Sequence, residues 1–175
     1  MSVPPVIVVC GRFWRMLAPK WAHKPLSGAG AATRGGRHNE RGVPALYMSE
    51  QFTTAIAEYE QDLGLRPGTL CAYEADMTDV VDLCDTAVCA AIGINPDDLR
   101  CPWKRIAFID KSRPPTWDIA KRLFDAGVSG IRVPSAQPIG STNLVLWRWN
   151  DAPDRKVGAL DPLGDLPVDQ SSWRS

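Results

Sequence analysis

The segment RGGRHNERG, residues 34–42, concentrates groups that can bind an anion on a backbone with little side-chain obstruction. It contains three arginines, three glycines, a histidine and an asparagine. Composition alone leaves two interpretations open. The segment is an exposed turn with scattered charges, or Gly35 and Gly36 let the backbone approach a ligand while the planar guanidinium of Arg37 grips a phosphate.

Three more side chains are of types used in catalysis, although none identifies a site alone. Glu58 on its own predicts a solvated charge, Tyr47 a core aromatic and Ser135 a turn hydroxyl. The sequence has no G-x-x-x-x-G-K-[ST] phosphate loop, no G-x-G-x-x-G fingerprint and no G-x-S-x-G elbow. P-loop nucleotide binding, dinucleotide binding of the Rossmann type and serine hydrolysis are therefore disfavoured.

The cysteine and histidine content does not predict a metal site. The five cysteines form no C-x-x-C pair, and His23 and His38 are the two histidines of the chain. Cysteines within apolar stretches are typical of reduced, core-filling thiols, so we expect a cytoplasmic protein without a metal.

The glutamate that could take part in catalysis is expected on a helix that follows a short buried strand, VPALYMS (43–49). Ser49 is predicted to cap this helix, with Glu50 as a solvated charge in its first turn. The helical period gives a core face formed by Phe52, Ala55, Ile56, Tyr59 and Leu63. Glu58 lies at the border of that face, about 100° from Tyr59, and is therefore able to point into a neighbouring cleft.

The remaining pattern mixes strands and helices without a regular βαβ rhythm, which favours an α+β fold. Apolar runs predict an N-terminal strand and further strands at 68–77, 79–83, 129–135 and 142–150. Helices are expected at 86–94 and 114–127, the second with proline at its start and glycine after its end. Residues 17–42 are predicted to form a long loop. We expect one domain, 1–150, followed by an irregular C-terminal tail, 151–175.

Charge and hydropathy restrict the partners of the chain. It has 175 residues, 45% of them hydrophobic, with 20 basic and 20 acidic side chains, so a core is feasible and the net charge is zero. A neutral chain is not suited to broad adhesion to nucleic acid or anionic membrane. No apolar run reaches the roughly 18–20 residues of a membrane helix, and a signal peptide is not expected.

Several spaced motifs, taken together, resemble the RES domain family, named for its arginine, glutamate and serine. The matching segments are FWR (13–15), GGRHN (35–39), YMS (47–49), AEYE (57–60), GIRVPS (130–135) and Asn143. They follow one another in the family's order and cover residues 12–150. His38 departs from the pattern, because the family usually has tryptophan at this position.

The resemblance implies an ADP-ribosyltransferase-like fold and a bacterial toxin of a type II toxin–antitoxin system. It implies NAD+ as co-substrate, no metal, and an Xre-like antitoxin that occludes the active site. The residues carried over as catalytic are Arg37, Tyr47, Glu58 and Ser135. Those expected to bind NAD+ are Arg15, Gly36, Arg37, His38, Asn39, Tyr47 and Asn143.

Breaking the nicotinamide–ribose bond suits these residue types. The ribose develops positive charge that Glu58 can stabilise, Arg37 can clamp the pyrophosphate, and the cationic nicotinamide can stack on Tyr47. The acceptor of ADP-ribose stays open. Transfer to a host protein is favoured, while attack by water or phosphate would deplete the NAD+ pool. A non-catalytic nucleotide- or peptide-binding module also remains possible, whereas a nuclease is disfavoured by the neutral charge.

Overall fold

The computed structural model describes residues 4–61, 64–137 and 141–171. It has one mixed sheet whose six strands are β1 (Ile7–Leu17), β2 (Leu46–Ser49), β3 (Thr69–Asp82), β4 (Gly130–Pro134), β5 (Thr142–Leu146) and β6 (Arg155–Ala159). The α-helices of the described residues are α1 (Ala29–Arg34), α2 (Phe52–Glu60), α3 (Thr86–Ala91) and α4 (Pro115–Asp125). The predicted α+β class is confirmed.

The sheet folds back on itself. Its strand order is β1-β2-β5-β4-β3-β6, and β1 also pairs with β3 along nearly its whole length. The β3–β4 pair is parallel, while the other pairs are antiparallel. Because β1 pairs on both edges, the inner face of the sheet encloses a core of its own.

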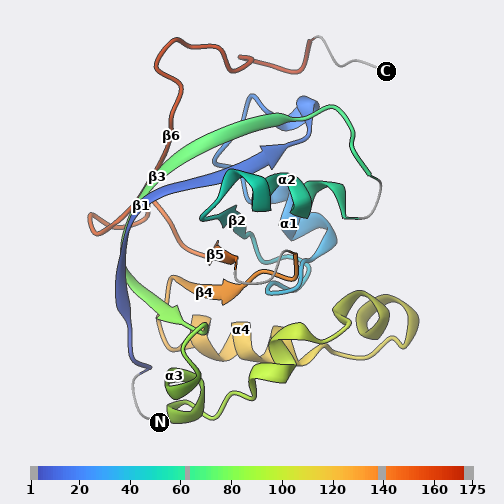
Figure 1. Ribbon diagram of the computed structural model, residues 1–175, viewed down its shortest axis with the longest axis vertical. Coiled ribbons are helices and arrows are strands. Elements are labelled where there is room, and N and C mark those ends of the chain that lie inside the picture. Colours follow the sequence, from blue (N-terminus) through green and yellow to red (C-terminus); the bar gives the residue numbers. More distant parts are fainter. Residues whose placement is uncertain (1–3, 62–63, 138–140, 172–175) are drawn as a thin grey trace.

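Alternation along the strands separates two cores, as the period of two requires. On β5, Leu144 and Leu146 enter the inner core, whereas Val145 faces the outer one. The outer core is completed by α3, α4 and the 3₁₀-helix η2 (Pro96–Arg100). In Figure 1, α4 runs beside β4 and β5, and α2 crosses the sheet near β1 and β2, which it contacts. Within the described residues, no helix has the length and apolar character needed to span a membrane.

Three predicted segments differ from the structure in their local form. The strands expected at 68–77 and 79–83 are one continuous strand, β3. The long loop at 17–42 contains the 3₁₀-helix η1 (Pro19–Trp21) and helix α1. The expectation of an irregular tail is wrong for Arg155–Ala159, which forms β6 and pairs with β3 from Tyr73 to Met77. That strand pairing was not visible in the proline- and aspartate-rich composition of 151–175.

The start of α2 also differs from the prediction. Ser49 is the last residue of β2 rather than the cap, and the N-cap residue, Gln51, makes no side-chain capping hydrogen bond. Glu50 is not a free solvated charge, because its carboxylate accepts a hydrogen bond from Arg132 Nε at 2.6 Å. Of the predicted core face, Phe52 is 51% exposed, and Leu63 lies outside the described residues.

We expect Leu144→Ala to lower the free energy of unfolding by about 2–5 kcal/mol, because it leaves a cavity in the fully buried inner core. Urea unfolding followed by circular dichroism measures the effect. Leu163→Ala is the matched control, since Leu163 is 83% exposed and should change stability by less than about 0.5 kcal/mol. Equal losses in the two variants would contradict the assignment of this core.

Candidate active site

A cavity of about 330 Å³ lies where β1, β2, β5, α2 and the glycine loop (34–42) meet. Ligand pockets typically span roughly 300–1,000 Å³, so the cavity is large enough to hold part or most of a dinucleotide. The structure brings most of the residues selected from the sequence into its lining: Arg15, Gly36, Arg37, His38, Tyr47, Glu58 and Asn143. Residues that are up to 128 positions apart in the chain, Arg15 and Asn143, therefore share one cavity.

The carboxylate of Glu58 is fixed by two donors, Ser135 directly after β4 and Asn143 on β5. Its Oε1 atom accepts hydrogen bonds from Ser135 Oγ at 2.6 Å and from Asn143 Nδ2 at 2.8 Å. Asn143 is oriented in turn by Ser49, whose hydroxyl donates to Asn143 Oδ1 at 2.7 Å. The other carboxylate oxygen, Oε2, accepts a longer bond of 3.3 Å from Gln61. Oε1 thus accepts two short hydrogen bonds from the protein, whereas Oε2 accepts only the longer one and can also accept a bond from a ligand.

Ser135 binds Glu58 from outside the lining of the main cavity. It lines a second cavity of about 550 Å³, which shares Pro134 and Ala136 with the first. The backbone N–H of Gln137 donates to Ser135 Oγ at 3.0 Å, which leaves the hydroxyl proton for Glu58. Ser135, expected to be catalytic, therefore contacts the glutamate but does not line the main cavity itself.

The hydroxyl of Tyr47 holds the glycine loop on the sheet. It accepts a bond from the His38 backbone N–H at 3.0 Å and donates to Asn39 Oδ1 at 2.7 Å. Burial raises the pKa of Tyr47 above its usual value, so the hydroxyl keeps its proton as a donor. A Cβ atom on Gly36 would lie 2.5 Å from both Tyr47 Oη and Asn39 Oδ1. The glycine at this position is therefore required by contacts within the protein.

Asn39 does not belong to the cavity lining. Its side-chain Nδ2 donates to the carbonyls of Ala31, Glu40 and Val43, and its Oδ1 accepts a hydrogen bond from the Tyr47 hydroxyl. The residue is 1% exposed. Its hydrogen-bonding capacity is used to shape the loop, so the structure gives it a supporting position where the sequence suggested contact with NAD+.

Both arginines of the cavity are tied to backbone carbonyls. Arg37 Nη1 donates to Cys101 O at 2.6 Å and to Leu99 O at 3.4 Å. Arg15 Nη1 donates to Pro25 O and Ser27 O at 3.4 and 3.3 Å, and burial lowers the pKa of its guanidinium. These bonds fix two positive charges at the wall of the cavity.

His38 is a neutral, buried histidine between the main cavity and a smaller one of about 230 Å³. Burial, with a smaller contribution from the charge of Arg37, lowers its pKa from 6.5 to about 3. Its Nδ1 atom is buried and has no hydrogen-bond partner, whereas its backbone carbonyl accepts from Trp147 Nε1 at 2.8 Å.

Several lining residues were not selected from the sequence. Ser49 was interpreted as a helix cap, although its place two residues after Tyr47 puts both side chains on one face of a strand. Trp14, Trp103 and Lys104 also line the cavity. For Trp103 and Lys104 the sequence contained no usable signal, because 101–113 matches neither a strand nor a regular helix. Among the described residues, no cluster of histidine, cysteine and carboxylate side chains could hold a metal ion.

These features define an α+β protein with a carboxylate-centred cavity flanked by guanidinium groups. The RES domain family model matches residues 12–169, and the chain belongs to this family. Among solved structures, the fold resembles that in the crystal structure of the M. tuberculosis MbcT–MbcA toxin–antitoxin complex. The TM-score is 0.59 at 23% sequence identity, covering 90% of this chain and 87% of that chain. Comparison with curated proteins finds no match.

The predicted mixed sheet with flanking helices is confirmed, and the likeness to this solved structure agrees with it in fold. The family match extends beyond residue 150 and includes β6.

We expect Gly36→Ala to destabilise the protein by about 1–3 kcal/mol, because the added methyl group overlaps Tyr47 and Asn39. Chemical denaturation measures the change. Gly30→Ala is the matched control. Its Cβ would meet nothing within 4 Å, and alanine favours the helix α1, so this variant should be as stable as the parent or more stable. If both variants unfold alike, the packing around Gly36 is not as described.

We expect His38 to make the protein less stable as the pH falls below 6.5. The unfolded chain binds a proton near pH 6.5, while the folded chain resists it down to about 3, so stability is lost as the pH falls through this window. The limiting slope is about 1.4 kcal/mol per pH unit. In urea unfolding, His38→Phe should flatten the dependence of the free energy of unfolding on pH between about pH 7.5 and about pH 5.5. Protonation of the carboxylates affects both proteins alike. Parallel profiles would show that His38 is not buried as a neutral group.

Proposed function

We propose that the protein is an NAD+-consuming toxin that cleaves the nicotinamide–ribose bond and transfers ADP-ribose to an acceptor, with a host protein as the favoured acceptor. The observation that carries the proposal is the position of Glu58. Its carboxylate, held by Ser135 and Asn143, lines the same cavity as Arg37 and Tyr47. Membership of the RES family supports the same conclusion.

The geometry suits the charge that develops during this reaction. When nicotinamide leaves, positive charge builds on the ribose, and a carboxylate fixed beforehand stabilises it without reorganising. Because Oε1 of Glu58 already accepts two bonds, Oε2 is the oxygen available to the ribose. Ser135 and Asn143 act through Glu58, as positioning residues.

Arg37 is the proposed clamp for the pyrophosphate. Its bonds to Cys101 and Leu99 use Nη1, so the N–H groups of Nε and Nη2 are free to pair with phosphate oxygens. Tyr47 contributes its ring as a wall of the cavity beside the nicotinamide, since its hydroxyl is already bonded to the glycine loop. Arg15 supplies a second positive charge at the wall.

We expect Glu58→Gln to reduce nicotinamide release about 10²–10³-fold, the loss of roughly 3–4 kcal/mol of transition-state stabilisation. Purified protein is incubated with NAD+ and nicotinamide is measured by chromatography. Glu60→Gln, on the same helix but outside the cavity lining, is the matched control and should retain parental turnover. A folded Glu58→Gln protein with the parental rate would rule out the proposed role of this carboxylate.

The acceptor is resolved by the fate of labelled NAD+ in a cell lysate. Label fixed on a protein band supports transfer to a protein target. Free ADP-ribose or its phosphate supports an NAD+ glycohydrolase or phosphorylase instead. Tight binding of NAD+ without release of nicotinamide would identify a non-catalytic binding module.

A toxin of this kind requires neutralisation in its own cell. We propose a cognate antitoxin with an Xre-like domain, a segment of which occludes the cavity. The structural likeness to a protein crystallised in a toxin–antitoxin complex supports a protein partner. The zero net charge of the chain favours a protein partner over direct contact with nucleic acid, and we propose that the protein acts in the cytoplasm.

A further inference from the structure

We propose that the indole of Trp103 is the platform on which the adenine base of the dinucleotide stacks. The proposal rests on the function proposed above, and it assigns a role to a segment, 101–112, for which neither the motifs nor the catalytic account has a use. Trp103 and Lys104 of this segment line the main cavity.

The orientation of the Trp103 ring is fixed by its own segment. Phe108 contacts it edge-on, with ring centroids 5.7 Å apart and an interplanar angle of 65°. Phe108 lies in the π-helix η3 (Arg105–Ile109), and the guanidinium of Arg41 stands 5.5 Å from its ring centroid. An aromatic face braced in this way loses little freedom when a flat base stacks on it. π-Helical turns are rare and are frequently found at functional sites.

The segment is bonded to the proposed phosphate clamp. Arg37 donates to Cys101 O at 2.6 Å, two residues before Trp103 in the chain. A pyrophosphate held by Arg37 therefore has Trp103 as a near neighbour. Lys104 Nζ lies 5.8 Å from the centroid of the Trp103 ring, which adds positive charge at this end of the cavity.

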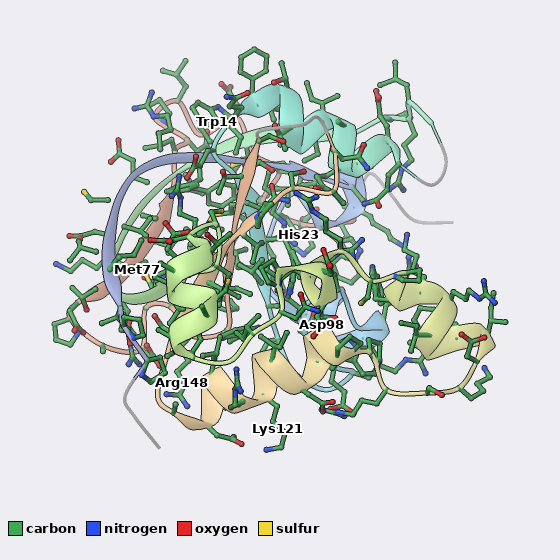
Figure 2. All side chains as sticks on the ribbon, turned by 60° about the horizontal axis from the view of Figure 1, so that its bottom comes forward. Trp14, His23, Met77, Asp98, Lys121 and Arg148 are labelled. Atoms are coloured by element: carbon green, nitrogen blue, oxygen red, sulfur yellow. The ribbon has the colours of Figure 1, made fainter. Side chains whose placement is uncertain are left out.

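The order of groups in the dinucleotide decides which base reaches Trp103. Nicotinamide and its ribose must be at Glu58, and the pyrophosphate at Arg37, so adenine continues past Arg37. The cavity has a different tryptophan on the Glu58 side. Trp14 pairs with Ser49, whose hydroxyl holds Asn143 against Glu58, and its ring packs edge-on against Phe52 at the start of α2. Figure 2 shows Trp14 beside this helix.

The chain also continues from Trp103 away from the sheet. In Figure 1 the π-helical coil projects beyond the first turn of α4, while α2, β2 and β5 lie on the other side of the glycine loop. The lining of the cavity thus combines residues of the strands and α2, where bond cleavage is proposed, with Trp103 and Lys104 of the 101–112 segment, where only binding is needed.

The test is equilibrium binding of AMP, which contains adenine and one phosphate but no nicotinamide, measured by calorimetry. Trp103→Leu should weaken AMP binding about 5- to 100-fold, the range expected when one base loses its aromatic stacking partner. Trp103→Phe should retain part of the affinity, because it keeps an aromatic face. Trp21→Leu, the matched control, should change AMP binding by less than about 2-fold, since Trp21 is 46% exposed and lies outside the lining of the cavity.

The proposal is overturned if Trp103→Leu binds AMP as the parent does, or if Trp103→Phe and Trp103→Leu lose equal affinity. It is also overturned if Trp21→Leu weakens AMP binding as much as Trp103→Leu, or if the parent turns over NAD+ but does not bind AMP. Because AMP binding requires no turnover, these results are independent of nicotinamide release. Failure of the proposed reaction and failure of the adenine platform can therefore be told apart.

Discussion

Two polar side chains on one face of β2 hold the two sides of the cavity in place. Tyr47 and Ser49 are separated by one residue, so their side chains project from the same face of the strand. The Tyr47 hydroxyl binds the glycine loop, which carries Arg37, and the Ser49 hydroxyl orients Asn143, which holds Glu58. The distance between the guanidinium and the carboxylate is therefore set by a rigid strand, whose other face is packed into the inner core.

The glycine loop is explained by protein contacts before any ligand is considered. Gly36 gives room to Tyr47, and its carbonyl accepts from Trp117 Nε1 at 2.8 Å. Glu40 pairs with Arg113 at 2.7 Å. A buried polar group without a partner costs about 1–3 kcal/mol, so a loop this polar needs such bonds to be stable. The polar groups concentrated in residues 34–42 are thus shared between holding the loop and, at Arg37, facing the cavity.

Sequence patterns predicted what is local and missed what depends on pairing over long distances. The proline and glycine that bound α4, the apolar run of β5 and the border position of Glu58 are properties of short windows, and each has its expected place in the structure. The second pairing of β1, the edge strand β6 and the ion pair of Glu50 with Arg132 join segments tens of residues apart. Asn39 shows the same limit within the site, because a motif gives its presence but not the direction of its side chain.

The zero net charge of the chain is compatible with the proposed dinucleotide site, because NAD+ and the cavity each carry separate positive and negative groups. In NAD+ the nicotinamide ring is cationic and the pyrophosphate anionic. In the cavity, the carboxylate of Glu58, the guanidinium of Arg37 and the ring of Tyr47 line the same space. A ligand with positive and negative groups in this order is attracted at both ends, while its reverse orientation is repelled at both. Orientation would thus be set by charge, and the reacting ribose carbon would be delivered to the carboxylate without a broad basic surface.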